Sequence, residues 1–482
     1  MYKTENFTPA DFKPKRFESD HTITLRGTEI PYHTVSEDNV FYNDDGKPIA
    51  SIFSYSYFRS DVTDTESRPV LFGFNGGPGS PSMYVHTGFM GPRRVVYTEL
   101  NRSSALGPYT VIDNPQCLLD IADLVLVDTV GTGYGVLLDP ESGKEFYGIE
   151  EDAEAFLTFV ESWLHRYNRW LSPKYLVGES YGCTRASVAA GIAATRGKDR
   201  SYGAAFDGLV LIGNTVTVGK YYNKEVPVES SVTGFPTFAA VNWYHNHPSD
   251  QSLEEFVKEA KAFADKDYLL ALYEGENLEG EAREAILDKV SYYTGMSKDY
   301  LEARAMKIDD GTFRQEVIKD KNMSAARFDG RFTRPRYIPE KVEESVGIRD
   351  DASSDRYGTY FYAALTGAIL PALNVRLDRQ YVRSVNVIET WNREAPKGTT
   401  AEQLRNAMMR IPGMRTFFAN GYYDGATEIG IVYYTVSHAG LPKDRVFVKG
   451  YPSGHMIYFG EDNIEELCND IRNFVEGSDP TK

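Results

Sequence analysis

The feature that most constrains this chain is the pentapeptide Gly178-Glu179-Ser180-Tyr181-Gly182. It follows the short apolar run Tyr175-Leu176-Val177, and residues 183–190 after it are typical of a helix. A strand, a sharp turn and a helix form the context in which Gly-x-Ser-x-Gly presents a nucleophilic serine. Glycines suit such a turn because neighbouring side chains would clash with its strained backbone. The bare pattern also occurs in surface turns, but the flanking strand and helix favour a nucleophile.

Further apolar runs of strand length lie on both sides of this turn. They occupy residues 69–75, 124–127, 207–213, 415–420 and 445–449. Helical spacing of apolar residues precedes the turn at 150–170 and closes the chain at 463–475. Continuous apolar runs separated by helices are typical of an α/β protein with a mostly parallel central sheet. Alternating segments between 22 and 60, with turn residues at 43–46, predict an antiparallel opening with a hairpin.

The composition changes near residue 228. Residues 252–300 are charged and helical in period, and polar stretches continue to about 399, with 347–358 indicating a linker. The charged runs by themselves are best explained as solvated helix faces. We therefore predict a core formed by residues 1–228 and 395–482, with a helical cap inserted at 229–394.

Composition excludes several classes of function. The 482 residues contain 52 Lys and Arg against 69 Asp and Glu, a net charge of −17, which argues against a nucleic-acid or anionic-membrane surface. No run of 18 apolar residues occurs, and the first residues contain no apolar signal segment, so we expect no membrane span. Three cysteines without C-x-x-C spacing argue against a disulfide framework. A cytoplasmic location is expected, or a secreted or periplasmic one if a signal peptide has been removed.

No cofactor or metal is expected. The glycine-rich segment 75–79 lacks the Gly-Lys-Ser/Thr of a phosphate loop, and 131–135 lacks the third glycine of a dinucleotide fingerprint. His245 and His247 form a pair too small for a metal site without further ligands.

A serine hydroxyl becomes an effective nucleophile when a base removes its proton and an acid orients that base. Of the eight histidines, His455 follows the last apolar run, and Asp424 follows the run at 415–420. Loops at the carboxyl ends of parallel strands are where such sheets place their sites. The order Ser180, Asp424, His455 is that of the α/β-hydrolase fold. Asp128 is the competing acid, although it precedes the serine, and the alternative for Asp424 is an ordinary turn aspartate.

An oxyanion hole in this fold uses the N–H after the nucleophile, here that of Tyr181, and a second N–H from a loop after an earlier strand. Asn75-Gly76-Gly77-Pro78-Gly79 supplies such a loop, and its glycines allow the backbone to approach a reacting carbonyl.

These segments resemble the serine carboxypeptidase family. The similar blocks, which follow the family's order and span nearly the whole chain, are 75–79, 127–134, 178–182, 421–424 and 454–456. NGGPG together with GESYG is far more specific than Gly-x-Ser-x-Gly alone. The resemblance implies an α/β-hydrolase that removes the C-terminal residue of a peptide through an acyl-enzyme. The implied partner is a peptide with a free C-terminus; the sequence does not indicate an oligomeric state.

The resemblance also implies three groups of site residues. The catalytic triad is Ser180, Asp424 and His455. The oxyanion hole is formed by the N–H groups of Gly77 and Tyr181. The terminal carboxylate of the substrate is held by Asn75, Gly76 and Glu179. Since two carboxylates this close cannot both ionise cheaply, we expect substrate binding to favour acidic pH.

The chain departs from the family pattern at two informative positions. An acid usually precedes Gly-Pro in a second carboxylate-binding element, whereas this chain has Phe89-Met90-Gly91-Pro92. Arg93 or Arg94 could replace that acid by gripping a carboxylate bidentately, or could have a plain surface role. Ser80 stands where the family often has a disulfide cysteine, which puts secretion in doubt.

Other functions fit the same motifs. An acyltransferase or an esterase would use the same triad, and an aminopeptidase of this fold also has a Gly-Gly-Pro-Gly loop. A binding protein that has lost catalysis is a further alternative. Glu179 and Asn75 favour the carboxypeptidase because they offer recognition of a carboxylate.

Overall fold

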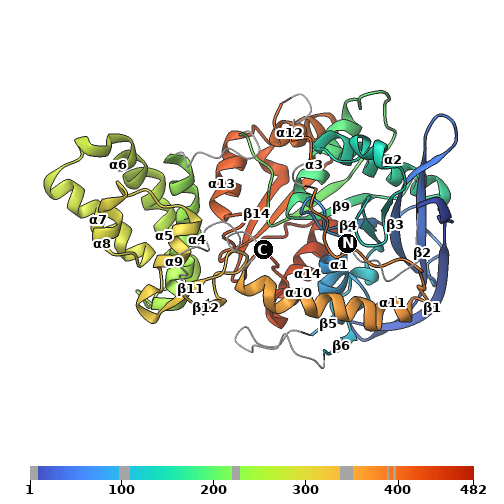
Figure 1. Cartoon of the computed structure of the whole chain (residues 1–482), viewed down its shortest axis with the longest axis horizontal. Coiled ribbons are helices and arrows are strands. Elements are labelled where there is room, and N and C mark those ends of the chain that lie inside the picture. The colour runs from blue at the N-terminus through green and yellow to red at the C-terminus, as the bar shows by residue number, and fades with distance from the viewer. Residues whose placement is uncertain (1–8, 97–108, 220–227, 337–350, 388–389, 394–397) are drawn as a thin grey trace.

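The computed structural model describes residues 9–96, 109–219, 228–336, 351–387, 390–393 and 398–482 (Figure 1). Its centre is a ten-stranded sheet with the order β1-β2-β3-β7-β4-β9-β10-β13-β14, in which β8 pairs with β3. The strands are β1 (Arg16–Leu25), β2 (Thr28–Tyr42), β3 (Pro48–Arg59), β4 (Val70–Phe74), β7 (Asp123–Asp128), β8 (Val136–Leu137), β9 (Lys174–Glu179), β10 (Gly208–Ile212), β13 (Arg415–Gly421) and β14 (Val446–Tyr451).

The sheet has an antiparallel half and a parallel half. Strands β1, β2, β3 and β7 pair antiparallel, whereas β7, β4, β9, β10, β13 and β14 run parallel to one another. The predicted hairpin lies between β2 and β3, where the N–H of Gly46 donates to the carbonyl of Asn43. The predicted fold class, a mostly parallel sheet of the α/β-hydrolase type, is confirmed.

Helices cover both faces of the sheet because successive side chains of a strand point to opposite sides. In β4, Phe72 lies in the buried cluster that contains Trp163 of α2, whereas Leu71 lies in the cluster that contains Leu467 of α14. The helices of this core are α1 (Met83–Val85), α2 (Ile149–Arg166), α3 (Tyr181–Ala194), α10 (Ala352–Ala364), α11 (Leu370–Ala372), α12 (Thr400–Arg410), α13 (Ile429–His438) and α14 (Glu461–Val475). Two short ribbons, β5 (Arg93–Val95) with β6 (Val111–Asp113) and β11 (Met323–Ala325) with β12 (Thr333–Pro335), complete the strands.

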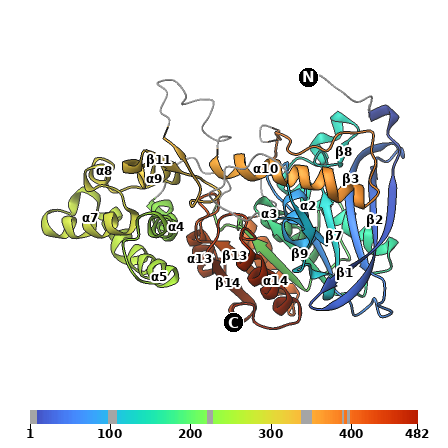
Figure 2. The ribbon, with the colours of Figure 1, turned by 90° about the horizontal axis from the view of Figure 1, so that it is seen from below.

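The inserted helices form a lobe at the end of the molecule opposite to β1 and β2, as both views show (Figures 1 and 2). They are α4 (Val228–Asn246), α5 (Leu253–Phe263), α6 (Leu269–Glu274), α7 (Gly280–Thr294), α8 (Lys298–Ala303) and α9 (Asp310–Glu316). Their apolar side chains share one buried cluster, which also contains Tyr422, Tyr423 and Ile429 from the core. The boundaries 229–394 stay a prediction, and most residues of this separate cluster come from α4–α9.

Helix α10 corrects the predicted linker at 347–358. Residues 347–350 lie outside the described residues, and a helix begins at Ala352. Tyr357, Tyr360, Phe361 and Ala364 recur at helical spacing and are buried in the core cluster beside the sheet. The polar stretch that suggested a linker therefore contains the first turn of an amphipathic helix. Within the described part of the chain, no helix combines the length and the apolar character that a membrane crossing requires.

Candidate active site

Ser180 lies at the turn between β9 and α3, where its backbone adopts φ 60° and ψ −128°. A left-handed φ is uncommon for a residue with a side chain and stores strain at this turn. Gly178 and Gly182 allow the close packing that the turn requires, since a Cβ on Gly178 would lie 2.4 Å from the carbonyl oxygen of Gly182. Ser180 lines a cavity of about 650 Å³.

His455 and Asp424, which the sequence pairs as base and acid, are in direct contact. The imidazole Nδ1 lies 2.7 Å from Oδ2 of Asp424. Asp424 is fully buried and accepts further hydrogen bonds from the N–H groups of Ala426 and Thr427 and from the Thr427 hydroxyl. With the Nδ1 hydrogen directed at Asp424, Nε2 is left to accept a proton.

The electrostatics of this pair favour a charged base. Burial penalises the charged form of both groups. At Asp424 burial is outweighed by the charge and hydrogen bond of His455, so the pKa of the carboxyl is lowered. At His455 burial is outweighed by the charge and hydrogen bond of Asp424 and by the charge of Glu179, so the pKa of the imidazole is raised. The pair therefore stabilises the imidazolium that forms when the histidine takes a proton.

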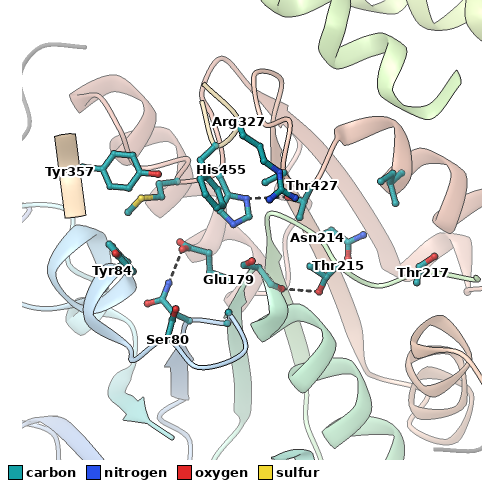
Figure 3. Close-up of a pocket in the computed structure, with 18 residues that line it drawn as sticks. Ser80, Tyr84, Glu179, Asn214, Thr215, Thr217, Arg327, Tyr357, Thr427 and His455 are labelled. Atoms are coloured by element: carbon teal, nitrogen blue, oxygen red, sulfur yellow. Dashed lines mark hydrogen bonds between the residues drawn. The ribbon is translucent and has the colours of Figure 1, made fainter. Parts of the chain in front are cut away.

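Ser180 and His455 line the same cavity, whose wall Figure 3 shows with His455 labelled. Between these two described residues, however, the serine hydroxyl and the imidazole form no hydrogen bond. Catalytic hydrogen bonds are often long before substrate binds and tighten in the complex. The structure thus brings the three predicted residues together, with the His455–Asp424 half of the triad already formed.

Asp128, the competing acid, lies in a different place. It is fully buried at the end of β7, where it accepts hydrogen bonds from the N–H and hydroxyl of Ser82 and from the hydroxyl of Tyr55. Asp128 therefore anchors the chain just after the glycine loop and does not orient His455.

The glycine loop packs against the first turn of α3. A Cβ on Gly76 would lie 2.3 Å from the backbone nitrogen of Tyr181, so a side chain at this position would separate the two segments. Gly77 has φ 106°, a conformation that residues with side chains rarely adopt. The predicted oxyanion donors, Gly77 and Tyr181, thus lie in adjoining segments. They adjoin the N-terminus of a 14-residue helix, whose dipole favours negative charge.

Glu179 is buried in the cavity wall beside the serine. Its Oε1 accepts a hydrogen bond of 2.7 Å from Nδ2 of Asn75, whose Oδ1 in turn accepts from the N–H of Val85 (Figure 3). Burial is the main cause that raises the pKa of Glu179 to about 7, and Asn75 among others works against it. The predicted carboxylate-binding residues Asn75, Gly76 and Glu179 therefore lie together, and one of them is a carboxyl that holds its proton up to near-neutral pH.

Tyr458 is a site residue that the sequence analysis missed. Its hydroxyl donates a hydrogen bond of 2.7 Å to Oε2 of Glu179. Its ring packs on Phe89, which belongs to the segment that lacks the family's acid, with centroids 5.0 Å apart. The signal available in the sequence was its position three residues after His455. A tyrosine supported by a phenylalanine thus occupies the region where a second carboxyl was expected.

Arg93 and Arg94 do not replace the missing acid. Both lie on β5, and neither lines the cavity. The Arg94 side chain is buried and pairs with Glu461, while Arg93 lies 3.6 Å from Asp113. The alternative in which either arginine grips the terminal carboxylate is therefore wrong.

Other polar groups of the described chain have structural surroundings. Cys117, Cys183 and Cys468 are free thiols in the buried interior. Within the described ranges, no group of three or more His, Cys, Asp and Glu side chains is arranged to hold a metal ion. His245 has a hydrogen bond of 2.7 Å with the carbonyl of Gly330.

Comparisons with known proteins agree with this geometry. The family model described as "Serine carboxypeptidase" matches residues 42–454. Serine carboxypeptidase-like 36 of Arabidopsis thaliana is 31% identical over 134 residues, which cover 27% of this chain and 26% of that protein. The matched segment thus spans about a quarter of that relative. The crystal structure of Kex1(delta)p, a prohormone-processing carboxypeptidase from Saccharomyces cerevisiae, has a TM-score of 0.54 at 15% identity and covers 92% of both chains. This likeness supports the fold.

Proposed function

Because this chain belongs to the serine carboxypeptidase family, we propose that it is a serine-type carboxypeptidase that removes the C-terminal residue of peptides. The observation that carries this proposal is the buried Glu179 carboxyl beside Ser180, hydrogen-bonded to Asn75 in the cavity wall. Hydrolysis of a carbonyl compound does not need such a group, whereas recognition of a terminal carboxylate does.

In the proposed mechanism, the Ser180 hydroxyl attacks the carbonyl of the last peptide bond while Nε2 of His455 takes its proton. Asp424 stabilises the resulting imidazolium. The N–H groups of Gly77 and Tyr181 stabilise the oxyanion of the tetrahedral intermediate. The C–N bond then breaks, His455 returns the proton to the leaving amine, and an acyl-enzyme remains. A water molecule, activated by the same histidine, releases the shortened peptide.

The proposed site makes two opposing demands on pH. His455 must be neutral to act as a base, so the rate falls on the acidic side of its raised pKa. Glu179 must keep its proton to lie beside the substrate's carboxylate, so binding weakens as pH rises through about 7. A peptide with a free carboxylate should therefore have its optimum displaced toward acidic pH relative to a peptide that lacks the carboxylate.

The test uses three substrates that share one blocked acyl residue: a free-carboxylate dipeptide, its C-terminal amide and a simple ester. Release of the C-terminal residue from the free dipeptide, in preference to the amide and absent in Ser180→Ala, is the expected result. Cleavage of the ester alone would make the protein an esterase. Transfer to an added alcohol or amine in excess of hydrolysis would make it an acyltransferase, which uses the same triad and differs in excluding water.

A further inference from the structure

The cavity contains a cation that the mechanism above does not use. Of the described residues that line it, Arg327 is the sole arginine or lysine, and Glu179 is the sole acidic residue. Arg327 belongs to the inserted region, two residues after β11. Figure 3 shows its side chain extending toward Thr427, beside His455.

The backbone of this segment is tied to the catalytic loops. The carbonyl of Arg327 accepts a hydrogen bond of 2.9 Å from the N–H of Gly425, next to Asp424. The carbonyl of Phe328 accepts a hydrogen bond of 2.6 Å from the N–H of His455. The backbone at Arg327 and Phe328 is therefore held beside the loops that carry both the acid and the base.

The guanidinium of Arg327 is available for a ligand. Within the described ranges the guanidinium has no hydrogen-bond acceptor and no carboxylate in ion-pair contact. It lies over the ring of Phe328, whose centroid is 5.7 Å away, and it is attracted at longer range by Asp310 and Glu428. A guanidinium carries five N–H donors, and leaving them unused in a half-buried position is unfavourable. A planar carboxylate is the group that matches these donors best.

Within the described ranges, the acidic neighbours of Arg327 form no ion pair with its guanidinium. Asp351 accepts a hydrogen bond from the backbone N–H of Arg327. Asp310 already pairs with Arg314 at 2.9 Å. Burial raises the pKa of Glu428 well above its ordinary value, which favours the uncharged form of this carboxyl. The N–H donors of the guanidinium thus stay free for a substrate anion that enters the cavity.

We propose that Arg327 binds an acidic side chain of the peptide substrate and makes this protein selective for substrates with Glu or Asp beside the scissile bond. The proposal rests on the proposed carboxypeptidase function. The terminal carboxylate is held at Asn75 and Glu179, so the group at Arg327 is a second carboxylate. It belongs either to the residue that is released or to the residue that forms the acyl-enzyme.

The test compares blocked dipeptides in two matched pairs, with Glu or Gln as the released residue and with Glu or Gln as the acyl residue. The assay is run near pH 6, where a free Glu side chain is ionised. In one pair the parent enzyme should prefer Glu, and in Arg327→Gln the Glu/Gln ratio of kcat/KM should fall by roughly tenfold or more. Arg327→Lys should retain part of the preference for Glu, because lysine keeps the positive charge but lacks the paired N–H donors of the planar guanidinium. The pair that responds identifies the position of the acidic residue.

Arg383 provides the matched control, because it is an exposed arginine near Tyr84 that does not line the cavity. Unchanged Glu/Gln ratios in Arg327→Gln, or an equal fall in Arg383→Gln, would overturn the proposal. An equal loss for Glu and Gln peptides would place the terminal carboxylate at Arg327 instead, and would also overturn it.

Binding of the same peptides to Ser180→Ala, measured by calorimetry, separates this inference from the proposed function. If Ser180→Ala binds Glu peptides more tightly than Gln peptides only while Arg327 is present, and the parent enzyme releases no C-terminal residue, the Arg327 site is supported and the carboxypeptidase function is rejected. Release of the C-terminal residue without any preference for Glu would support the carboxypeptidase function and reject the Arg327 site. Thermal unfolding of each variant verifies that the comparison is made on folded protein.

Discussion

The hydroxyl of Tyr458 donates a hydrogen bond of 2.7 Å to Oε2 of Glu179, while Asn75 donates one to Oε1. The carboxyl is therefore held at both oxygens by neutral donors. Phe89, which packs on the Tyr458 ring, belongs to the segment in which the family's second acid is missing. Of the described residues that line the cavity, Glu179 is the sole carboxyl. The protonation state of Glu179 should therefore determine how well the site binds the carboxylate of a substrate.

Glu179→Gln should abolish the loss of affinity for the free-carboxylate substrate that is expected at alkaline pH. The amide resembles the protonated carboxyl but cannot ionise, so KM should stay flat between about pH 6 and 8, the range that brackets the parent's Glu179 pKa of about 7. Steady-state kinetics across this range measure it, with exposed Glu476→Gln as the control. A decline identical to that of the parent enzyme would show that Glu179 is not the titrating group.

Tyr458→Phe should shift the pH at which affinity for the free-carboxylate substrate falls to a higher value. Donation by a hydroxyl stabilises the Glu179 anion, and its removal should raise the pKa of Glu179 by about one unit. The decline in affinity for free-carboxylate peptides should shift upward by the same amount, while the C-terminal amide shows no shift. Tyr273→Phe, in a side chain that is 86% exposed, is the matched control. A shift toward lower pH would contradict the assigned role of Tyr458.

Asp424→Asn should lower kcat by about four orders of magnitude with little change in KM. An amide cannot hold the Nδ1 hydrogen of His455 in the orientation that leaves Nε2 free, and it does not stabilise the imidazolium. Pre-steady-state measurement of acyl-enzyme formation reports this step directly. Asp444→Asn on the surface serves for comparison. Retention of activity within tenfold of the parent would reject Asp424 as the acid.

Gly76→Ala should lower kcat at least 100-fold. The added Cβ would lie 2.3 Å from the backbone nitrogen of Tyr181, and no side-chain rotation can relieve a clash with the backbone. The glycine loop and the first turn of α3 must then separate, which misplaces the oxyanion donors. Gly367→Ala is the control, because a Cβ at this exposed glycine meets nothing within 4 Å. Unaltered kcat in Gly76→Ala would contradict the proposed oxyanion hole.

Arg185→Met should destabilise the fold by about 3–5 kcal/mol, because it leaves Asp152 charged and buried without its partner. Arg185 is 1% exposed and joins Asp152, at 2.7 Å, to the carbonyl of Asn75, at 2.8 Å. Denaturant unfolding measures the loss. Arg200→Met breaks an ion pair of 3.5 Å on the surface and should change the free energy of unfolding by about 1 kcal/mol or less. Equal effects of the two substitutions would show that the buried network of Arg185 contributes no more to the free energy of unfolding than a surface ion pair does.

Local patterns in the sequence were sufficient to predict much of the fold. The apolar runs at 69–75, 207–213 and 415–420 are the strands β4, β10 and β13. The turn at Ser180 has the strained backbone that Gly-x-Ser-x-Gly predicts. These predictions depend on the period of side chains and on turn geometry, which act over a few residues and are therefore visible in the chain itself.

By itself, then, the sequence determined the order of the strands along the chain, the nucleophile turn and the order of the three predicted triad residues. Only the tertiary structure decided which side chains complete the site. Tyr458 meets Glu179 across 279 residues of chain, and Arg327 reaches the cavity from the inserted region. Such contacts depend on how the sheet and the insertion pack in three dimensions. The spacing of residues along the chain does not contain this information, so the sequence alone does not identify Tyr458 or Arg327 as neighbours of the triad.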